Sequence, residues 1–135
     1  ETNNGAERAI RNLKVKLKQA SAEKLQFKDN YFDYVLAMAV LHHLKNPEIG
    51  VKEIRRVLKN NGEVYITDWN KLQARFLFKK KEIYVPWKQR HQTLYRYYHF
   101  MGYFKLRKML KKNNFKILKS GFLGKNIFFH VKKFS

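Results

Sequence analysis

The stretch EIRRVLKNNGEVYI, residues 53–66, decides the fold class. An apolar stripe at helical spacing runs into it, formed by Ile49, Ile54, Val57 and Leu58. The Asn-Asn-Gly run at 60–62 predicts the end of that helix. The β-prone residues 63–68 predict a strand directly after it. A helix that turns on a glycine into a strand is the repeating step of an α/β fold.

The α/β pattern continues upstream of this stretch. Asn46 and Pro47 supply a helix start, an N-cap side chain followed by proline at the first helical position. Residues 32–40 are almost continuously apolar, which predicts a central parallel strand covered on both faces. Residues 13–18 alternate between apolar side chains and lysine, which predicts an edge strand with one buried face. A polar loop is expected at 21–30.

Downstream the pattern changes character. Residues 71–101 are aromatic without a clear period, and we expect irregular structure with short helices there. Residues 103–112 form a basic amphipathic pattern that predicts a helix. Residues 115–122 and 126–134 predict a closing antiparallel hairpin that turns at Gly124.

Charge is distributed unevenly along the chain. The formal net charge is +20, yet residues 1–69 carry 12 Lys and Arg against 9 Asp and Glu, while residues 70–135 carry 18 against 1. The second half also holds 15 of the 21 aromatic residues. A balanced half followed by a basic, aromatic half predicts a catalytic scaffold joined to a surface for a polyanion, because a surface that serves solubility alone mixes both signs of charge.

Other features of composition narrow the class of protein. The sequence has no cysteine, which excludes disulfides and thiolate metal sites. No apolar run approaches the roughly 20 residues that span a bilayer, and the first residues do not have the pattern of a signal peptide. We therefore expect a soluble, cytoplasmic protein of one domain.

Several short motifs indicate a particular family within the α/β class. Residues 20–27, 29–35 and 41–44 resemble the run from the third to the fourth strand of class I S-adenosylmethionine-dependent methyltransferases. Residues 53–66 resemble the next helix, glycine turn and fifth strand of that family. The resemblance covers roughly residues 13–68. It implies a partial Rossmann-like α/β sheet that lacks its first two strands and ends in an antiparallel hairpin.

The resemblance also implies a division of the single domain. Residues 13–68 would form the core of the methyltransferase sheet. Residues 69–114 would form a basic, aromatic, substrate-binding insert and helix, and residues 115–134 the terminal hairpin.

Within the superfamily, residues 37–44, 84–87 and 96–100 look like the tRNA wobble-uridine carboxymethyl methyltransferases. That likeness implies S-adenosylmethionine as cofactor and tRNA as substrate. It also implies a small zinc-binding activator protein, which would dock at the edge strand near 13–18. Two alternatives stay open: a small-molecule methyltransferase of the same superfamily, and an RNA-binding remnant without catalysis.

The sequence departs from the family in its cofactor motifs. The glycine-rich loop and the acidic end of the second strand are absent, and Ala20-Ser21 stands where the family has a Gly-Asp pair. We expect a truncated domain that needs its missing half, in cis or in trans, and that binds little cofactor alone. In the family's sheet the missing strands lie beside residues 32–40, so that strand would show unpaired backbone groups.

The candidate cofactor residues follow from the resemblance. Ser21, Ala22 and Glu23 would lie beside the adenine, with a solvated loop as the alternative. The other three end the predicted central strand, where open α/β sheets bind ligands, with core packing as the alternative: Ala37, Met38 and Ala39.

The candidate catalytic residues are Arg96, Tyr97, His99 and His42. A carboxylate acceptor is already ionised at neutral pH, so catalysis is mostly alignment, and arginine has the planar fork that grips a carboxylate. The alternative for Arg96 is an exposed arginine on a buried aromatic helix. His42 would line the acceptor pocket or pack in the core, and no metal site is expected because neighbours on a helix point in different directions.

The candidate RNA-binding residues combine ring stacking with phosphate contact. They are Tyr98, Trp87, Lys79, Lys80, Lys81, Lys88, Arg90, Arg107, Lys108, Lys111 and Lys112.

Overall fold

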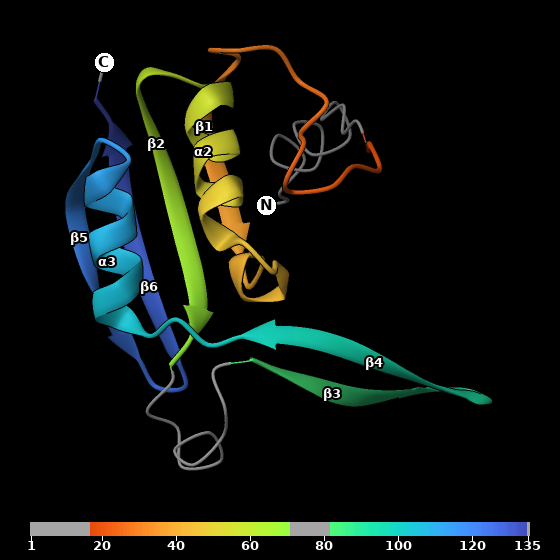
Figure 1. Cartoon of the computed structure of the whole chain (residues 1–135). Coiled ribbons are helices and arrows are strands. Elements are labelled where there is room, and N and C mark those ends of the chain that lie inside the picture. The colour runs from red at the N-terminus through yellow and green to blue at the C-terminus, as the bar shows by residue number, and fades with distance from the viewer. Residues whose placement is uncertain (1–16, 71–81, 135) are drawn as a thin grey trace, which may run out of the picture.

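The computed structural model describes residues 17–70 and 82–134. Its main sheet has the order β1-β2-β6-β5 (Figure 1). The strands are β1 (Phe32–Met38), β2 (Leu58–Trp69), β5 (Phe115–Leu123) and β6 (Asn126–Lys133). β1 pairs with β2 in parallel, and the other two pairings are antiparallel. The predicted α/β class and the closing hairpin are confirmed.

Two helices, α2 (Pro47–Val57) and α3 (Tyr103–Lys112), lie on the same face of this sheet (Figure 1). The core lies between them and the strands, and it includes Val51 and Leu106 from the helices and Val64, Ile66 and Phe129 from the sheet. α2 starts as predicted, with Asn46 at the N-cap and proline next. Neither helix of the described residues has the length and apolar character that crossing a membrane takes.

The prediction that residues 32–40 form a strand covered on both faces is wrong in its second part. β1 is the edge strand of the described sheet, and the side chains of Tyr34, Leu36 and Met38 are 71%, 72% and 61% exposed. Ala37 points to the other face and is buried in the core. Apolar residues show that a strand can be buried, but they do not show that other elements pack on both of its faces. Most of the strand predicted at 13–18 lies outside the described residues.

The turn predicted at 60–62 is also placed differently. α2 ends at Val57, and β2 begins at the next residue. The left-handed backbone falls within this strand, at Asn61 with φ 64°. A Cβ added to Gly62 would stand 2.8 Å from the carbonyl oxygen of Lys59, so only glycine fits this close approach.

The segment expected to be irregular forms a second, two-stranded sheet. β3 (Glu82–Gln89) and β4 (Gln92–His99) pair antiparallel and project away from the main sheet (Figure 1). Cross-strand pairs such as Tyr84 with Tyr97, whose ring centroids are 5.5 Å apart, stabilise the ribbon. The short helices expected within this stretch do not occur in its described part.

Candidate active site

The carboxyl ends of β1 and β2 meet at one edge of the main sheet, the position at which open α/β sheets bind ligands. After β1 the chain turns at Ala39, which has φ 55° and donates its backbone N–H to the carbonyl of Thr67 over 2.9 Å. The 3-10 helix η1 (Leu41–His43) follows directly. A left-handed alanine is strained and needs support from its surroundings, so this turn fixes where η1 begins.

A chain of hydrogen bonds starts from η1. The Nδ1 atom of His42 is bonded to Oδ1 of Asp68, the last buried side chain of β2, and both side chains are buried. The Nε2 atoms of His42 and His43 are 3.1 Å apart, and Nδ1 of His43 lies 3.1 Å from the carbonyl oxygen of Tyr97 on β4. The expectation that the two imidazoles point in different directions is wrong, because the tight 3-10 turn brings their rings to a 4.2 Å centroid distance.

The carbonyl of Tyr97 can only accept, so Nδ1 of His43 donates to it. Burial is the main cause that lowers the pKa of His43. Each ring nitrogen of the two histidines thus has a partner within the protein.

Aromatic rings fix the base of the hairpin to this edge. Tyr98 is buried, with its ring centroid 4.4 Å from that of Trp69, 5.2 Å from His42 and 4.7 Å from His43. This placement does not favour the base-stacking role expected of Tyr98, since its ring packs against protein partners. It instead holds β4 against the end of β2.

The remaining predicted catalytic residues alternate along β4, because the segment is a strand rather than a helix. Arg96 is exposed, and its guanidinium carbon lies 3.4 Å from the centroid of the Trp87 ring, a cation–π stack across the hairpin. Tyr97 and His99 point to the opposite face, with Tyr97 Oη 3.5 Å from Nδ1 of the buried His99. The ribbon therefore brings Arg96 and Trp87 together and separates Arg96 from Tyr97 and His99.

A second feature of the edge is an apolar cavity of about 160 Å³ under β1. Ala22 and Ala37, two of the six predicted cofactor residues, both line it. Ser21 and Glu23 are exposed, and the hydroxyl of Ser21 accepts the backbone N–H of Glu23 over 3.1 Å. Met38 and Ala39 are exposed as well.

Arg56 of α2 holds the loop that forms one wall of this cavity. Its guanidinium donates to the carbonyls of Phe27 (2.7 Å) and Leu25 (2.9 Å) and to the carboxylate of Glu53. Glu53 in turn accepts the backbone N–H of Leu25 over 2.8 Å. The hydrogen bond from Arg56 is the main cause that lowers the pKa of Glu53. The loop position is therefore fixed by charged hydrogen bonds to α2.

These residues fit one part of S-adenosylmethionine. The cavity lining is apolar, with Ala22 and Ala37 small enough to admit the flat face of an adenine ring. Its lining residues include no carboxylate that could hold ribose hydroxyls. The lining of this cavity thus suits a flat apolar ring, and the described residues around it do not make a complete cofactor site.

The predicted phosphate-contact residues lie on α3 and the hairpin. Lys108 and Lys111 are exposed and Arg107 is half-buried, while Lys112 pairs with Glu48 of α2 over 3.1 Å. Trp87, Lys88 and Arg90 are exposed, and Arg90 lies at the hairpin turn. Lys79, Lys80 and Lys81 fall outside the described residues.

Sequence reasoning missed three side chains with long-range hydrogen bonds. Asp68 lies at this edge, Arg56 holds the loop beside the cavity, and Lys133 lies at the opposite end of the sheet. The partners of Asp68 and Arg56 lie about 26 to 31 positions away along the chain. Lys133 is buried and donates to the carbonyl of Leu58 over 2.7 Å. For Asp68, the sequence did contain a signal, because an acidic residue ends an otherwise apolar strand. Arg56 and Lys133 had no such signal.

In sequence, the chain is similar to methyltransferases. Residues 2–66 match the family described as a methyltransferase domain. A protein of Encephalitozoon cuniculi named as a methyltransferase is 32% identical over 120 residues, which cover 82% of this chain and 57% of that protein. The chain spans a little over half the length of that relative.

Two shorter matches point to different substrates. The "Probable tRNA methyltransferase 9B" of Mus musculus is 35% identical over 66 residues, 47% of this chain and 15% of that protein. A ubiquinone/menaquinone biosynthesis C-methyltransferase of Chromobacterium violaceum is 40% identical over 53 residues, 39% of this chain and 22% of that protein.

Structural comparison gives the fold. Crystal structures of S-adenosylmethionine-dependent methyltransferases from Clostridium acetobutylicum and Methanosarcina mazei match with TM-scores of 0.71 and 0.69. The matches cover 97% and 96% of this chain and 70% and 76% of those chains, at 10% and 19% identity. The predicted class I methyltransferase fold is confirmed.

Proposed function

We propose that this chain takes part in methyl transfer to tRNA, with a carboxylate on the wobble uridine as acceptor. The proposal starts from its class I methyltransferase fold and from the likeness of residues 2–66 to a methyltransferase domain. S-adenosylmethionine supplies the methyl group when bound. The residues of this chain would wall the adenine, align the acceptor and bind the RNA.

The observation that carries the proposal is the stack of Arg96 on Trp87. A guanidinium held flat on an indole keeps its N–H groups in the plane, where they can donate two parallel hydrogen bonds to a carboxylate. Arg96 is exposed, and its neighbour Tyr97 is bonded to His43 of the active-site edge. The guanidinium of Arg96, which can bind a carboxylate, thus belongs to the residue directly before Tyr97, the residue that contacts the methyl-transfer edge.

The histidine pair supports an acceptor that is already ionised. A phenol, an amine or a carbon acid must lose a proton to be methylated, and a base must receive it. The nitrogens of His42 and His43 are all engaged in hydrogen bonds within the protein. A carboxylate needs no such base, so alignment by Arg96 and the surrounding edge suffices.

The second candidate is methylation of a small molecule, which the likeness to the quinone-biosynthesis C-methyltransferase favours. The charge argues against it, since an apolar ring gains nothing from the field of 18 Lys and Arg in residues 70–135.

The proposal includes a covering partner for β1. The exposed side chains of Tyr34, Leu36 and Met38 form an apolar row on an edge strand, and such edges invite pairing with another strand. We expect this row to be covered by the cofactor-binding half of the complete enzyme, in cis or in trans. The zinc-binding activator remains part of the same proposal.

The test uses tRNA and S-adenosylmethionine labelled in its methyl group, with the complete enzyme. Methyl esters release methanol in mild alkali, whereas methyl groups on carbon or nitrogen stay attached. We expect label on tRNA that becomes volatile after alkali, and a large loss of this label in both Arg96→Lys and Arg96→Ala, with the salt dependence of tRNA binding unchanged. Alkali-stable label, or full activity in Arg96→Lys, would contradict the proposed acceptor.

A further inference from the structure

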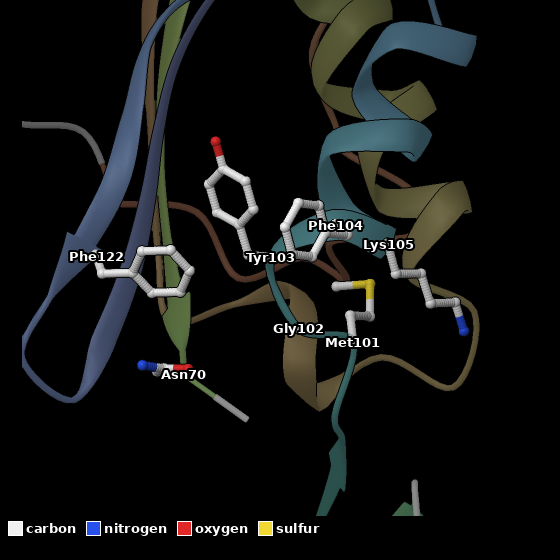
Figure 2. A pocket seen from close by; sticks show the side chains of 7 residues that line it. All are labelled: Asn70, Met101, Gly102, Tyr103, Phe104, Lys105 and Phe122. Atoms are coloured by element: carbon white, nitrogen blue, oxygen red, sulfur yellow. The ribbon is translucent and has the colours of Figure 1, made fainter. Parts of the chain in front are cut away.

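A cavity of about 240 Å³ lies just beyond β2, between the start of α3 and the end of β5 (Figure 2). Its walls are mainly aromatic and come from Tyr103 and Phe104 of α3 and Phe122 of β5, with Asn70 at the end of β2. Figure 2 shows the Tyr103 ring between the other two rings. The cavity is separate from the one lined by Ala22 and Ala37.

One of the three rings is fixed and the other two are presented to solvent. The hydroxyl of Tyr103 lies 2.7 Å from Oγ of Ser120, and its ring stacks on the buried Phe129 at 4.9 Å. Phe122 stacks on Tyr103 at 5.0 Å, and Phe104 meets it edge-on at 5.2 Å. Phe104 is nevertheless 79% exposed and Phe122 50% exposed. Two phenyl rings thus offer free surface beside a rigid tyrosine.

A basic groove continues from this cavity. A second hollow of about 490 Å³ lies between α3 and β5, and Tyr103 lines both hollows. The cationic side chains in the groove are Arg107, Lys111 and Lys116. After Glu82 the sequence contains no further Asp or Glu, so α3 and β5 supply no acidic side chain of their own, although Lys112 of α3 pairs with Glu48 of α2.

We propose that the two hollows together bind a nucleotide of single-stranded RNA outside the methyl-transfer edge. The base stacks on Phe104 or Phe122 in the aromatic cavity, and the adjoining phosphates lie over Arg107 and Lys111 in the groove. Exposed rings beside a cationic track are the arrangement by which single strands are bound. The adjacent charge favours a polyanion over a neutral apolar ring. This inference rests on the proposed function for its choice of RNA. It uses two of the predicted phosphate-contact residues, Arg107 and Lys111, and adds the rings of Phe104 and Phe122.

The experiment measures binding of a fluorescent ten-nucleotide oligo(U) RNA by anisotropy across a salt series. The ring variants are Phe104→Leu and Phe122→Leu, alone and together, with Tyr31→Leu as an exposed aromatic control. The double ring variant should bind about tenfold more weakly at each salt concentration, the loss expected for one base stack, with an unchanged salt slope. Phe104→Leu alone should retain the thermal midpoint of the unmodified chain, since its ring is exposed.

The charge variant is Arg107→Gln with Lys111→Gln, and Lys28→Gln is its control on a distant exposed loop. Removing two phosphate contacts should reduce the salt slope by about 1.4. Ring variants that bind oligo(U) as tightly as Tyr31→Leu would overturn the inference. Oligo(U) binding that the ring variants lose, in an enzyme whose tRNA label is alkali-stable, would leave this site standing and refute the proposed acceptor.

Discussion

Removal of the Asp68 carboxylate tests the hydrogen-bond chain at the active-site edge. In Asp68→Ala, Nδ1 of His42 loses its hydrogen-bond partner in a site where the His42 side chain is 2% exposed. The backbone N–H of Trp69, which donates to Asp68 over 2.7 Å, loses its acceptor as well. Oδ2 of Asp68 is buried without a hydrogen-bond partner among the described residues, so the interactions of Oδ1 carry the stabilisation.

The magnitude follows from the burial of the pair. Each buried group that loses its hydrogen-bond partner costs about 1–3 kcal/mol, and Asp68→Ala removes the partner of two such groups, against a total of about 5–15 kcal/mol for a whole domain. Urea slopes for small domains are about 1–3 kcal/mol per molar, so the unfolding midpoint should fall by about 2 M or the chain should fail to fold. Urea titration followed by circular dichroism measures this shift.

Two further variants make the outcome decisive. Asp33→Ala breaks an exposed pair with Lys59 (3.2 Å) and should move the midpoint little. His42→Phe combined with Asp68→Leu replaces both partners by apolar side chains and should recover most of the lost stability. The reasoning is refuted if Asp68→Ala shifts the midpoint no more than Asp33→Ala does.

Three other predictions follow from individual contacts. Burial lowers the pKa of His43 below its ordinary value of 6.5. The unfolded chain therefore binds the proton more readily than the folded chain, and the free energy of unfolding should fall as the pH drops below about 6.5. In His43→Gln, the thermal midpoint should depend less on pH. Arg56→Met should release the loop held by the carbonyls of Leu25 and Phe27, and amide hydrogen exchange of that loop should rise while exchange in α3 stays unchanged. Gly62→Ala should destabilise the chain by about 1–3 kcal/mol in urea titration, because its Cβ would meet two backbone carbonyls, whereas Gly124→Ala, which has open space and φ 55°, should cost about 1 kcal/mol.

Elements with local signals were predictable from the sequence. The bounds of α3 matched the predicted residues because its lysines and apolar side chains alternate at helical spacing. The β5–β6 hairpin was predictable for a similar reason, with Gly124 at the turn in a left-handed conformation. Both elements are amphipathic, so their own residues show which face is buried.

Elements that depend on distant partners were not predictable. The β3–β4 ribbon contains Pro86 and a run of aromatics without a period, and its structure depends on register pairs such as Pro86 with Tyr95. The hydrogen bond of His42 to Asp68 spans 26 positions, and neither residue has a local pattern that names its partner. Long-range pairing is decided by the tertiary fold, which local propensity does not encode.

If the proposed function and the proposed nucleotide site are both correct, the end of β2 would couple methyl transfer to RNA binding. Asp68 is bonded to His42, Trp69 stacks on Tyr98 of the hairpin, and Asn70 borders the aromatic cavity. Asp68 and Trp69 point to opposite faces of the strand, and Asn70 follows its last residue, so three consecutive residues reach three separate features. A displacement of the β2 end would therefore move the methyl-transfer edge, the Arg96 ribbon and the proposed nucleotide cavity together. RNA bound at the cavity and ribbon would then fix the position of the acceptor relative to His42 and Asp68 without touching either.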